Sequence, residues 1–72
     1  MYKITLKLQE VRKLKHMTQK RLAVLASISQ GHISELESGN KSPTLKTLEN
    51  LADALKTYPY DLLEIETFKN KS

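Results

Sequence analysis

Few side chains in this 72-residue sequence have the chemistry and spacing of a catalytic or metal site. There is no Cys, so neither a disulfide nor a thiolate zinc site can form. His16 and His32 have no carboxylate at metal-ligand spacing, and no Ser stands in a nucleophilic arrangement with His and Asp. Gly31 and Gly39 do not form a phosphate-binding loop. We therefore expect no catalytic residue, no metal, no cofactor and no small-molecule substrate.

The charged side chains are distributed unevenly, and this points to a different kind of chemistry. Residues 1–41 hold eight Lys and Arg against three acids, a net charge of +5. Residues 42–72 hold four Lys against five acids, a net charge of −1. This asymmetry suits one face that binds a polyanion such as nucleic acid. A solvated surface with a chance excess of lysine is the alternative interpretation.

The composition predicts one small folded domain. Hydrophobic residues make up 39% of the sequence and charged residues 28%, which is ordinary for a globular domain. No apolar run approaches the roughly 20 residues that span a bilayer. The first residues contain no apolar segment of a signal peptide. We therefore expect a cytoplasmic protein that does not act at a membrane.

Short helices with abrupt ends are expected to position the polar side chains. Four hydroxyl residues each precede an apolar run at helical spacing and can cap it: Thr5, Thr18, Ser29 and Thr44. Pro59 can begin a fifth, short helix that carries Leu62 and Leu63. The polar tail over 69–72 is expected to be frayed. The sequence thus predicts an all-α fold of five short helices around one core of Leu, Ile and Ala.

The second and third predicted helices are separated only by the break Ser27-Ile28-Ser29, as in a helix-turn-helix. Ala23 is small enough for the two helices to cross closely, and Ile28 can fill the corner between them. Ser29 caps the third helix, whose N-terminus is then free to enter a DNA major groove about 12 Å wide. Gly39 can end this helix in a left-handed conformation.

From Leu8 to Leu63 the sequence resembles the Cro/XRE family of phage and bacterial repressors. The matching residues are Thr18-Gln19-x-x-Leu22-Ala23, Ile28-Ser29, Ile33-Ser34, Glu37-x-Gly39, Pro43 and Leu48-x-x-Leu51-Ala52-x-Ala54-Leu55. The resemblance implies a compact five-helix, lambda-repressor-like DNA-binding domain over 1–68, with the helix-turn-helix at about 18–38. It also implies a partly buried salt bridge between Arg12 and Glu37, where the alternative is two exposed charges of little energetic value.

The sequence departs from the family pattern at several turns. His16, Ser27 and Lys56 stand where Gly or Asn is frequent, so each is expected to adopt a left-handed backbone at some energetic cost. Tyr58 replaces the usual Ser, Thr or Asp cap of the last helix. Gly31 occupies a position that often carries a base-reading side chain, which leaves fewer direct readers here.

The expected DNA-binding residues lie on the second and third helices and in the loop after them: Gln19, Ser29, Gln30, His32, Ser34, Glu35, Asn40 and Lys41. Gln30 can donate to and accept from adenine N6 and N7. Glu35 can accept from cytosine N4 or can repel phosphate. The Gln19 amide and a backbone N–H at the same helix N-terminus can hold a phosphate. The resemblance implies that the loop with Lys41 lies against the DNA backbone.

A second copy of the chain is the other expected partner, because one domain covers only a short half-site. The predicted dimer interface lies in the C-terminal third: Tyr58, Tyr60, Leu62, Ile65 and Phe68. The segments 2–5 and 64–67 both alternate apolar with polar residues, so they can also pair as strands, within or between chains, with Lys3 facing Glu64 or Glu66.

Val24 and Leu25 face solvent in the predicted second helix. They are either harmless scattered apolar residues or part of a partner-binding patch.

These expectations converge on a sequence-specific, double-stranded-DNA-binding transcriptional regulator. We expect a repressor that acts as a dimer on a palindromic operator. The alternative is an antitoxin or a switch module that is controlled by a protein partner and uses the same DNA-binding fold. An enzyme is a remote third possibility.

Overall fold

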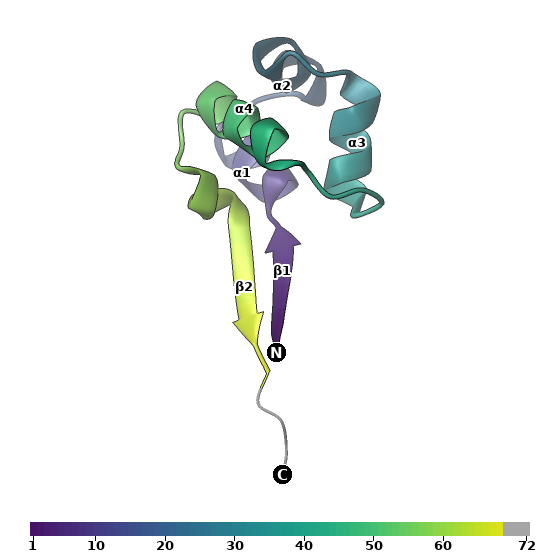
Figure 1. Cartoon of the computed structure of the whole chain (residues 1–72). Coiled ribbons are helices and arrows are strands. Elements are labelled where there is room, and N and C mark those ends of the chain that lie inside the picture. Colours follow the sequence, from purple (N-terminus) through teal and green to yellow (C-terminus); the bar gives the residue numbers. More distant parts are fainter. Residues whose placement is uncertain (69–72) are drawn as a thin grey trace.

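The computed structural model describes residues 1–68, which form a helical head (residues 8–62) and a projecting two-stranded β-ribbon (Figure 1). The elements in chain order are β1 (Tyr2–Leu6), α1 (Leu8–Leu14), α2 (Gln19–Ala26), α3 (Gln30–Ser38), α4 (Leu45–Leu55), the 3-10 helix η1 (Pro59–Leu62) and β2 (Leu63–Thr67). The tail over 69–72 that the sequence predicts to be frayed lies outside the described residues.

The fold is not all-α, because the segment before α1 is a strand. Thr5 and Leu6 lie in β1, so Thr5 is not the cap of the first helix. That helix begins only at Leu8, and its N-cap residue Lys7 makes no side-chain capping hydrogen bond. The alternation of apolar Tyr2 and Ile4 with polar neighbours suits a strand, and a partner strand at the other end of the chain stabilises it.

The expected fifth α-helix is a single 3-10 turn, so residues 1–68 contain four α-helices. Pro59 does begin this turn, where its fixed φ is compatible with helix entry. Leu62 ends it, and Leu63 is already extended at φ −118° and ψ 142°. The next residues, Glu64 to Thr67, alternate in the strand pattern and pair with β1 instead of continuing a helix.

The ribbon pairs the two ends of the chain within one molecule. β1 and β2 are antiparallel, with Ile4 opposite Ile65 and Lys3 opposite Glu66. Two backbone hydrogen bonds flank the ladder, from Lys7 N–H to the Leu62 carbonyl at 2.7 Å and from Phe68 N–H to the Met1 carbonyl at 2.8 Å. The expected possibility of strand pairing is therefore confirmed, and it places an opposite-charge pair across the strands.

Hydroxyl caps begin three of the four α-helices, as the sequence predicts. Thr18, Ser29 and Thr44 have extended backbones, and each side-chain oxygen accepts a hydrogen bond from the N–H three residues later. Each bond satisfies a backbone donor that has no partner inside the helix. These caps fix where α2, α3 and α4 begin.

A residue with a left-handed backbone conformation follows each of the four α-helices in residues 1–68. Gly39 follows α3 at φ 83°, as expected for a C-terminal Gly. His16, Ser27 and Lys56 also have positive φ, at 55°, 59° and 53°. The expectation that these three non-glycine residues adopt the left-handed conformation is confirmed, and each carries a Cβ that disfavours it.

The core lies entirely in the helical head, and all four α-helices of residues 1–68 and η1 contribute buried side chains to it. Its buried members are Leu8, Leu22, Ala23, Ala26, Ile33, Leu36, Leu51, Ala52, Leu55 and Leu62. Leu14 and Leu45 are 77% and 80% exposed because they lie at helix ends. Within residues 1–68, the helices are too short and too polar for any of them to cross a membrane.

Candidate nucleic-acid interface

In the unit formed by α2, the turn and α3, helix α2 anchors α3, and α3 exposes its outer side to solvent. Ala23 on α2 is only 6% exposed, and its carbonyl accepts a hydrogen bond from Ile28 N–H in the turn at 3.0 Å. Ile28 packs against the core at this corner. Ile33 and Leu36 hold the inner side of α3 in the core. The outer side of α3, with Gln30, is exposed to solvent.

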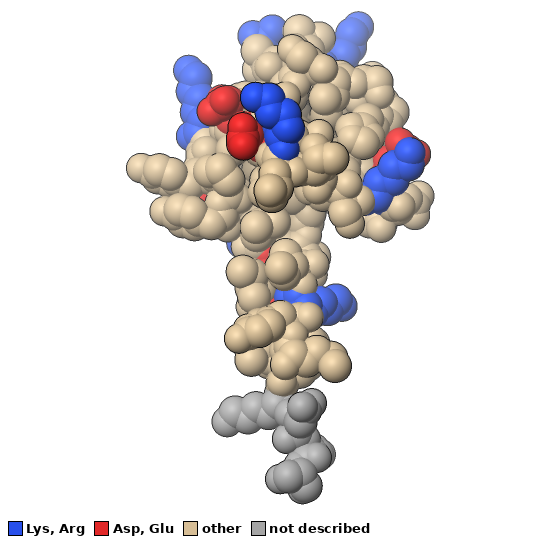
Figure 2. Space-filling model, in the orientation of Figure 1, with Lys and Arg blue, Asp and Glu red and all other residues tan. Residues whose placement is uncertain are grey.

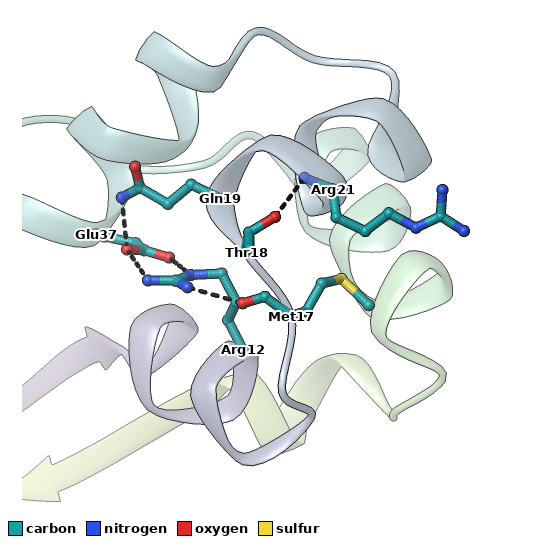
Figure 3. A network of polar contacts seen from close by, with 6 residues as sticks. All are labelled: Arg12, Met17, Thr18, Gln19, Arg21 and Glu37. Carbon is teal, nitrogen blue, oxygen red and sulfur yellow. Dashed lines mark hydrogen bonds and ion pairs between the residues drawn. The ribbon is translucent and has the colours of Figure 1, made fainter.

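A buried ion pair fixes the angle between α1 and α3 (Figure 3). Arg12 Nε donates to Glu37 Oε2 at 2.6 Å and Nη2 donates to Oε1 at 3.1 Å, a two-point contact between planar groups. Arg12 Nη1 also donates to the Met17 carbonyl at 2.8 Å. The two charged side chains are only 10% and 3% exposed. The pair that the resemblance implies is therefore present in this structure.

The environment of the pair stabilises both charges. Hydrogen bonding to Glu37 raises the pKa of Arg12 above its usual range, against the opposing effect of burial. Burial raises the pKa of Glu37. Hydrogen bonds from Arg12 and Gln19, together with the charges of Arg12 and Lys13, lower this pKa by more than burial raises it, so it lies below the ordinary value. Both groups are thus ionised near neutral pH.

Gln19 joins this network, a role that the sequence reasoning missed. Its Nε2 donates to Glu37 Oε1 at 3.0 Å, so three helices meet at one carboxylate (Figure 3). We expected the amide to hold a phosphate, and one of its two donor hydrogens is instead used inside the protein. The clue available in the sequence was that Gln19 is adjacent to the Thr18 cap and therefore at the α2 terminus nearest α1. Among the described residues, the Gln19 amide makes no other side-chain hydrogen bond.

The other expected DNA-binding residues gather at α3 and the loop after it. Gln30 and Ser34 are exposed on α3, and Ser29 Oγ accepts from His32 N–H as the cap. Glu35 lies between two basic groups, with Oε1 3.8 Å from His32 Nδ1 and Oε2 3.7 Å from Lys41 Nζ.

The loop after α3 folds back on that helix. Asn40 N–H and Lys41 N–H both donate to the Glu35 carbonyl, at 3.1 and 3.4 Å. The Glu35 residue therefore positions Lys41 through both its backbone and its side chain, beside the exposed surface of α3.

The expected dimer residues separate into exposed and buried ones. Tyr58 and Tyr60 are 65% and 68% exposed and stack with ring centroids 5.4 Å apart. Ile65 and Phe68 are exposed as well. Leu62 is a wrong prediction, because it has no exposed surface and belongs to the core. The 3-10 turn after Pro59 directs this side chain inward.

Positively charged side chains are spread over the head, and the ribbon is mostly uncharged in the view of Figure 2. Val24 and Leu25 on α2 face solvent as expected, at 65% and 42% exposure. Among residues 1–68, no group of three or more His, Asp or Glu is placed to hold a metal ion.

Comparison with known proteins gives consistent results. The family model described as helix-turn-helix matches residues 8–63. The HTH-type transcriptional regulator DdrOP3 of Deinococcus deserti is 37% identical over 62 residues, which cover 86% of this chain and 48% of that protein. The chain thus spans about half the length of this relative.

A second relative and a solved structure match over more of their own length. The control protein C.BamHI of Bacillus amyloliquefaciens is 32% identical over 66 residues, which cover 86% of this chain and 82% of that protein. The crystal structure of the restriction-modification controller protein C.AhdI from Aeromonas hydrophila superposes with a TM-score of 0.76 at 30% identity, covering 78% of this chain and 85% of that one.

Proposed function

Because the chain belongs to the DNA-binding helix-turn-helix family of transcriptional regulators, we propose that it recognises one operator through α3 and represses transcription there as a dimer. The observation that carries the proposal is that α3 has an exposed, capped N-terminus while Glu37, in its last turn, is held in a buried ion pair with Arg12. The pair holds the helix at one angle, so its side chains meet a major groove in one register.

The residues of this surface divide into base readers and phosphate binders. Gln30, in the first turn of α3, has the donor and acceptor that match adenine N6 and N7. Lys41 and the N-terminal N–H groups of α2 supply positive charge for phosphates. A phosphate that binds Lys41 competes with Glu35, which lies 3.7 Å from the ammonium group in the free protein. Sequence preference then comes from α3, and orientation comes from the flanking groups.

Salt dependence tests the proposal directly. A duplex selected from a random pool should bind with an affinity whose logarithm falls with the logarithm of salt concentration, by about 0.9 for each phosphate contacted. Fluorescence anisotropy at several salt concentrations measures this slope. A salt-independent affinity, or the absence of duplex binding, would contradict DNA recognition. A reporter gene placed behind the selected site then gives the sign of regulation.

The dimer is proposed because a single α3 reads only a short half-site, and half-sites of dimers lie about one helical turn apart. Exposed aromatic and aliphatic residues of the C-terminal third support it: Tyr58, Tyr60, Ile65 and Phe68. Sedimentation of Tyr60→Ala beside the parent protein tests the aromatic part of this surface. Equal association would move the interface away from the stacked tyrosines.

A second candidate function is a switch whose activity is set by a protein partner, as in an antitoxin. The exposed Val24 and Leu25 on α2 favour it, because each is a large apolar side chain that contact with a partner would remove from water. The neighbouring genes discriminate the two. A toxin gene beside this one favours the switch, whereas a methyltransferase gene favours a controller like the restriction-modification relative.

A further inference from the structure

The strand register divides the ribbon into two faces of opposite character. Directly paired residues lie on the same side of a sheet, and successive residues alternate sides. One side therefore carries the apolar ribbon face, which consists of Tyr2, Ile4, Leu6, Leu63 and Ile65 with Thr67 at its tip. The opposite side carries Lys3, Thr5, Glu64 and Glu66. No charged residue lies on the apolar ribbon face.

This face is uncovered over most of its length. Leu6 and Leu63 are half-buried where the ribbon joins the head, and Leu6 packs against the core. Farther out, Tyr2 is 72% exposed, and the directly opposed Ile4 and Ile65 are 62% and 60% exposed. An isolated two-stranded ribbon is marginally stable in water, and a contact on its apolar side stabilises it.

We propose that the apolar ribbon face packs against the same face of a second copy of this chain across a two-fold axis. The inference rests on the proposed dimeric function and gives it a surface. A two-fold contact needs a patch that is complementary to itself, and a patch without charges meets its own copy without repulsion. The neighbouring Glu64 and Glu66 disfavour DNA or an anionic lipid surface as the occupant.

Edge-to-edge pairing fits the same strands less well. If two β2 strands paired about Ile65, Glu64 would lie opposite Glu66 of the partner subunit on both sides of the axis, and like charges directly opposed are destabilising. Pairing of two β1 strands would avoid this repulsion but would leave Tyr2, Ile4 and Ile65 in water. Packing face to face covers these side chains and leaves the charged residues in solvent.

The size of the face predicts a weak dimer in free solution. Strands of five residues are about 16 Å long, so the patch is well below the roughly 800 Å² per partner of a standard interface. Binding of two copies to adjacent half-sites raises their effective concentration. The ribbon contact should therefore be populated mainly on a duplex that carries two half-sites.

Single-cysteine variants test the contact, since the chain has no natural Cys. Ile4→Cys labels the apolar ribbon face, and Thr5→Cys is the matched control on the opposite face. Stacked sheets lie about 10 Å apart, too far for a direct disulfide, so a short bismaleimide is the appropriate cross-linker. Ile4→Cys should form covalent dimers that increase with protein concentration and on the selected duplex, while Thr5→Cys should not. Equal cross-linking of the two variants would overturn the proposal.

The Ile4→Cys substitution could itself weaken the dimer, so a second pair of variants tests the contact without a cysteine. The double variant Ile4→Thr with Ile65→Thr keeps β-branched residues in the strands and should weaken association by about tenfold or more in sedimentation. Lys3→Thr, on the polar face, should leave association unchanged. A parent protein that dimerises on the duplex with both variants unaffected overturns the ribbon contact alone. A parent that binds the duplex only as a monomer overturns the proposed dimer itself.

Discussion

Two regions of this molecule bury and expose opposite kinds of side chain. The α3 end comprises α3 and its ion pair with α1, and the ribbon end comprises β1 and β2. At the α3 end, the charged pair Arg12 and Glu37 is almost wholly removed from water, and within residues 1–68 no buried side-chain polar atom lacks a hydrogen-bond partner. At the ribbon end, Ile4 and Ile65 are mostly in water. The first region is complete within one chain and must stay rigid to present α3. The second has an apolar surface that the described residues do not cover.

The largest effect is expected where the buried pair loses a partner. Arg12→Ala should lower the free energy of unfolding by about 3–5 kcal/mol, because Glu37 is left charged and buried. Lys13→Ala, an exposed neighbour, is the control and should change stability little. Thermal melts followed by circular dichroism measure both. If the two variants had the same melting temperature, the ion pair would not be what stabilises the α3 end.

Low pH should destabilise the α3 end, because it protonates the Glu37 carboxylate of the ion pair. The folded-state pKa of Glu37 lies below the ordinary value of 4.5, so its contribution to stability is fully present above that pH. It is lost as the pH falls through the lowered folded-state pKa. Glu37→Gln should remove this part of the acid dependence, and urea titrations between neutral and acidic pH measure it. An unchanged acid profile in the variant would show that other carboxylates dominate.

The two ends also differ in how far the sequence predicts them. The caps at Thr18, Ser29 and Thr44 were predictable because a hydroxyl before an apolar run has a local, physical role. The ribbon was visible only as alternation at both ends of the chain. Whether those ends met each other, or formed a helix, depended on contacts between residues 57 to 65 positions apart in sequence, from the pair Leu6–Leu63 to the pair Tyr2–Thr67.

Within the site, the family resemblance implied the ion pair between Arg12 and Glu37, but the sequence did not predict that Gln19 joins it. The side-chain bond between Gln19 and Glu37 requires the relative placement of α2 and α3, which residue spacing does not give. The burial of Leu62 was missed for a similar reason, because a 3-10 turn and an α-helix point the same residue in different directions.

DNA binding should separate base reading from phosphate contact at the α3 end. Gln30→Ala should cost about 1–3 kcal/mol at one base pair and relax the preference there. Lys41→Ala should weaken all sequences similarly and reduce the salt slope by about 1. Lys46→Ala, on an exposed part of α4, is the control for lost charge. Binding to a panel of single-base duplex variants measures these effects. Matching profiles for Gln30→Ala and Lys41→Ala would contradict the division of roles.

The smallest expected effect concerns the left-handed turns, all of which lie in the head. Lys56 ends α4 at φ 53°, where a Cβ costs about 1–2 kcal/mol and glycine has no such penalty. Glycine also loses about 0.5–1 kcal/mol through the greater freedom of the unfolded chain. Lys56→Gly should therefore stabilise the head by about 0–1.5 kcal/mol, the range of the difference between these two effects.

Lys56→Ala separates this backbone effect from the loss of charge, because it removes the ammonium group and keeps the Cβ. It should not raise the melting temperature. Association through the apolar ribbon face should be the same in both variants, since the ribbon contains no left-handed residue. A change in association on Lys56→Gly would mean that the two ends are energetically coupled. The α4–η1 connection, which joins the head to β2, would then be the segment that couples them.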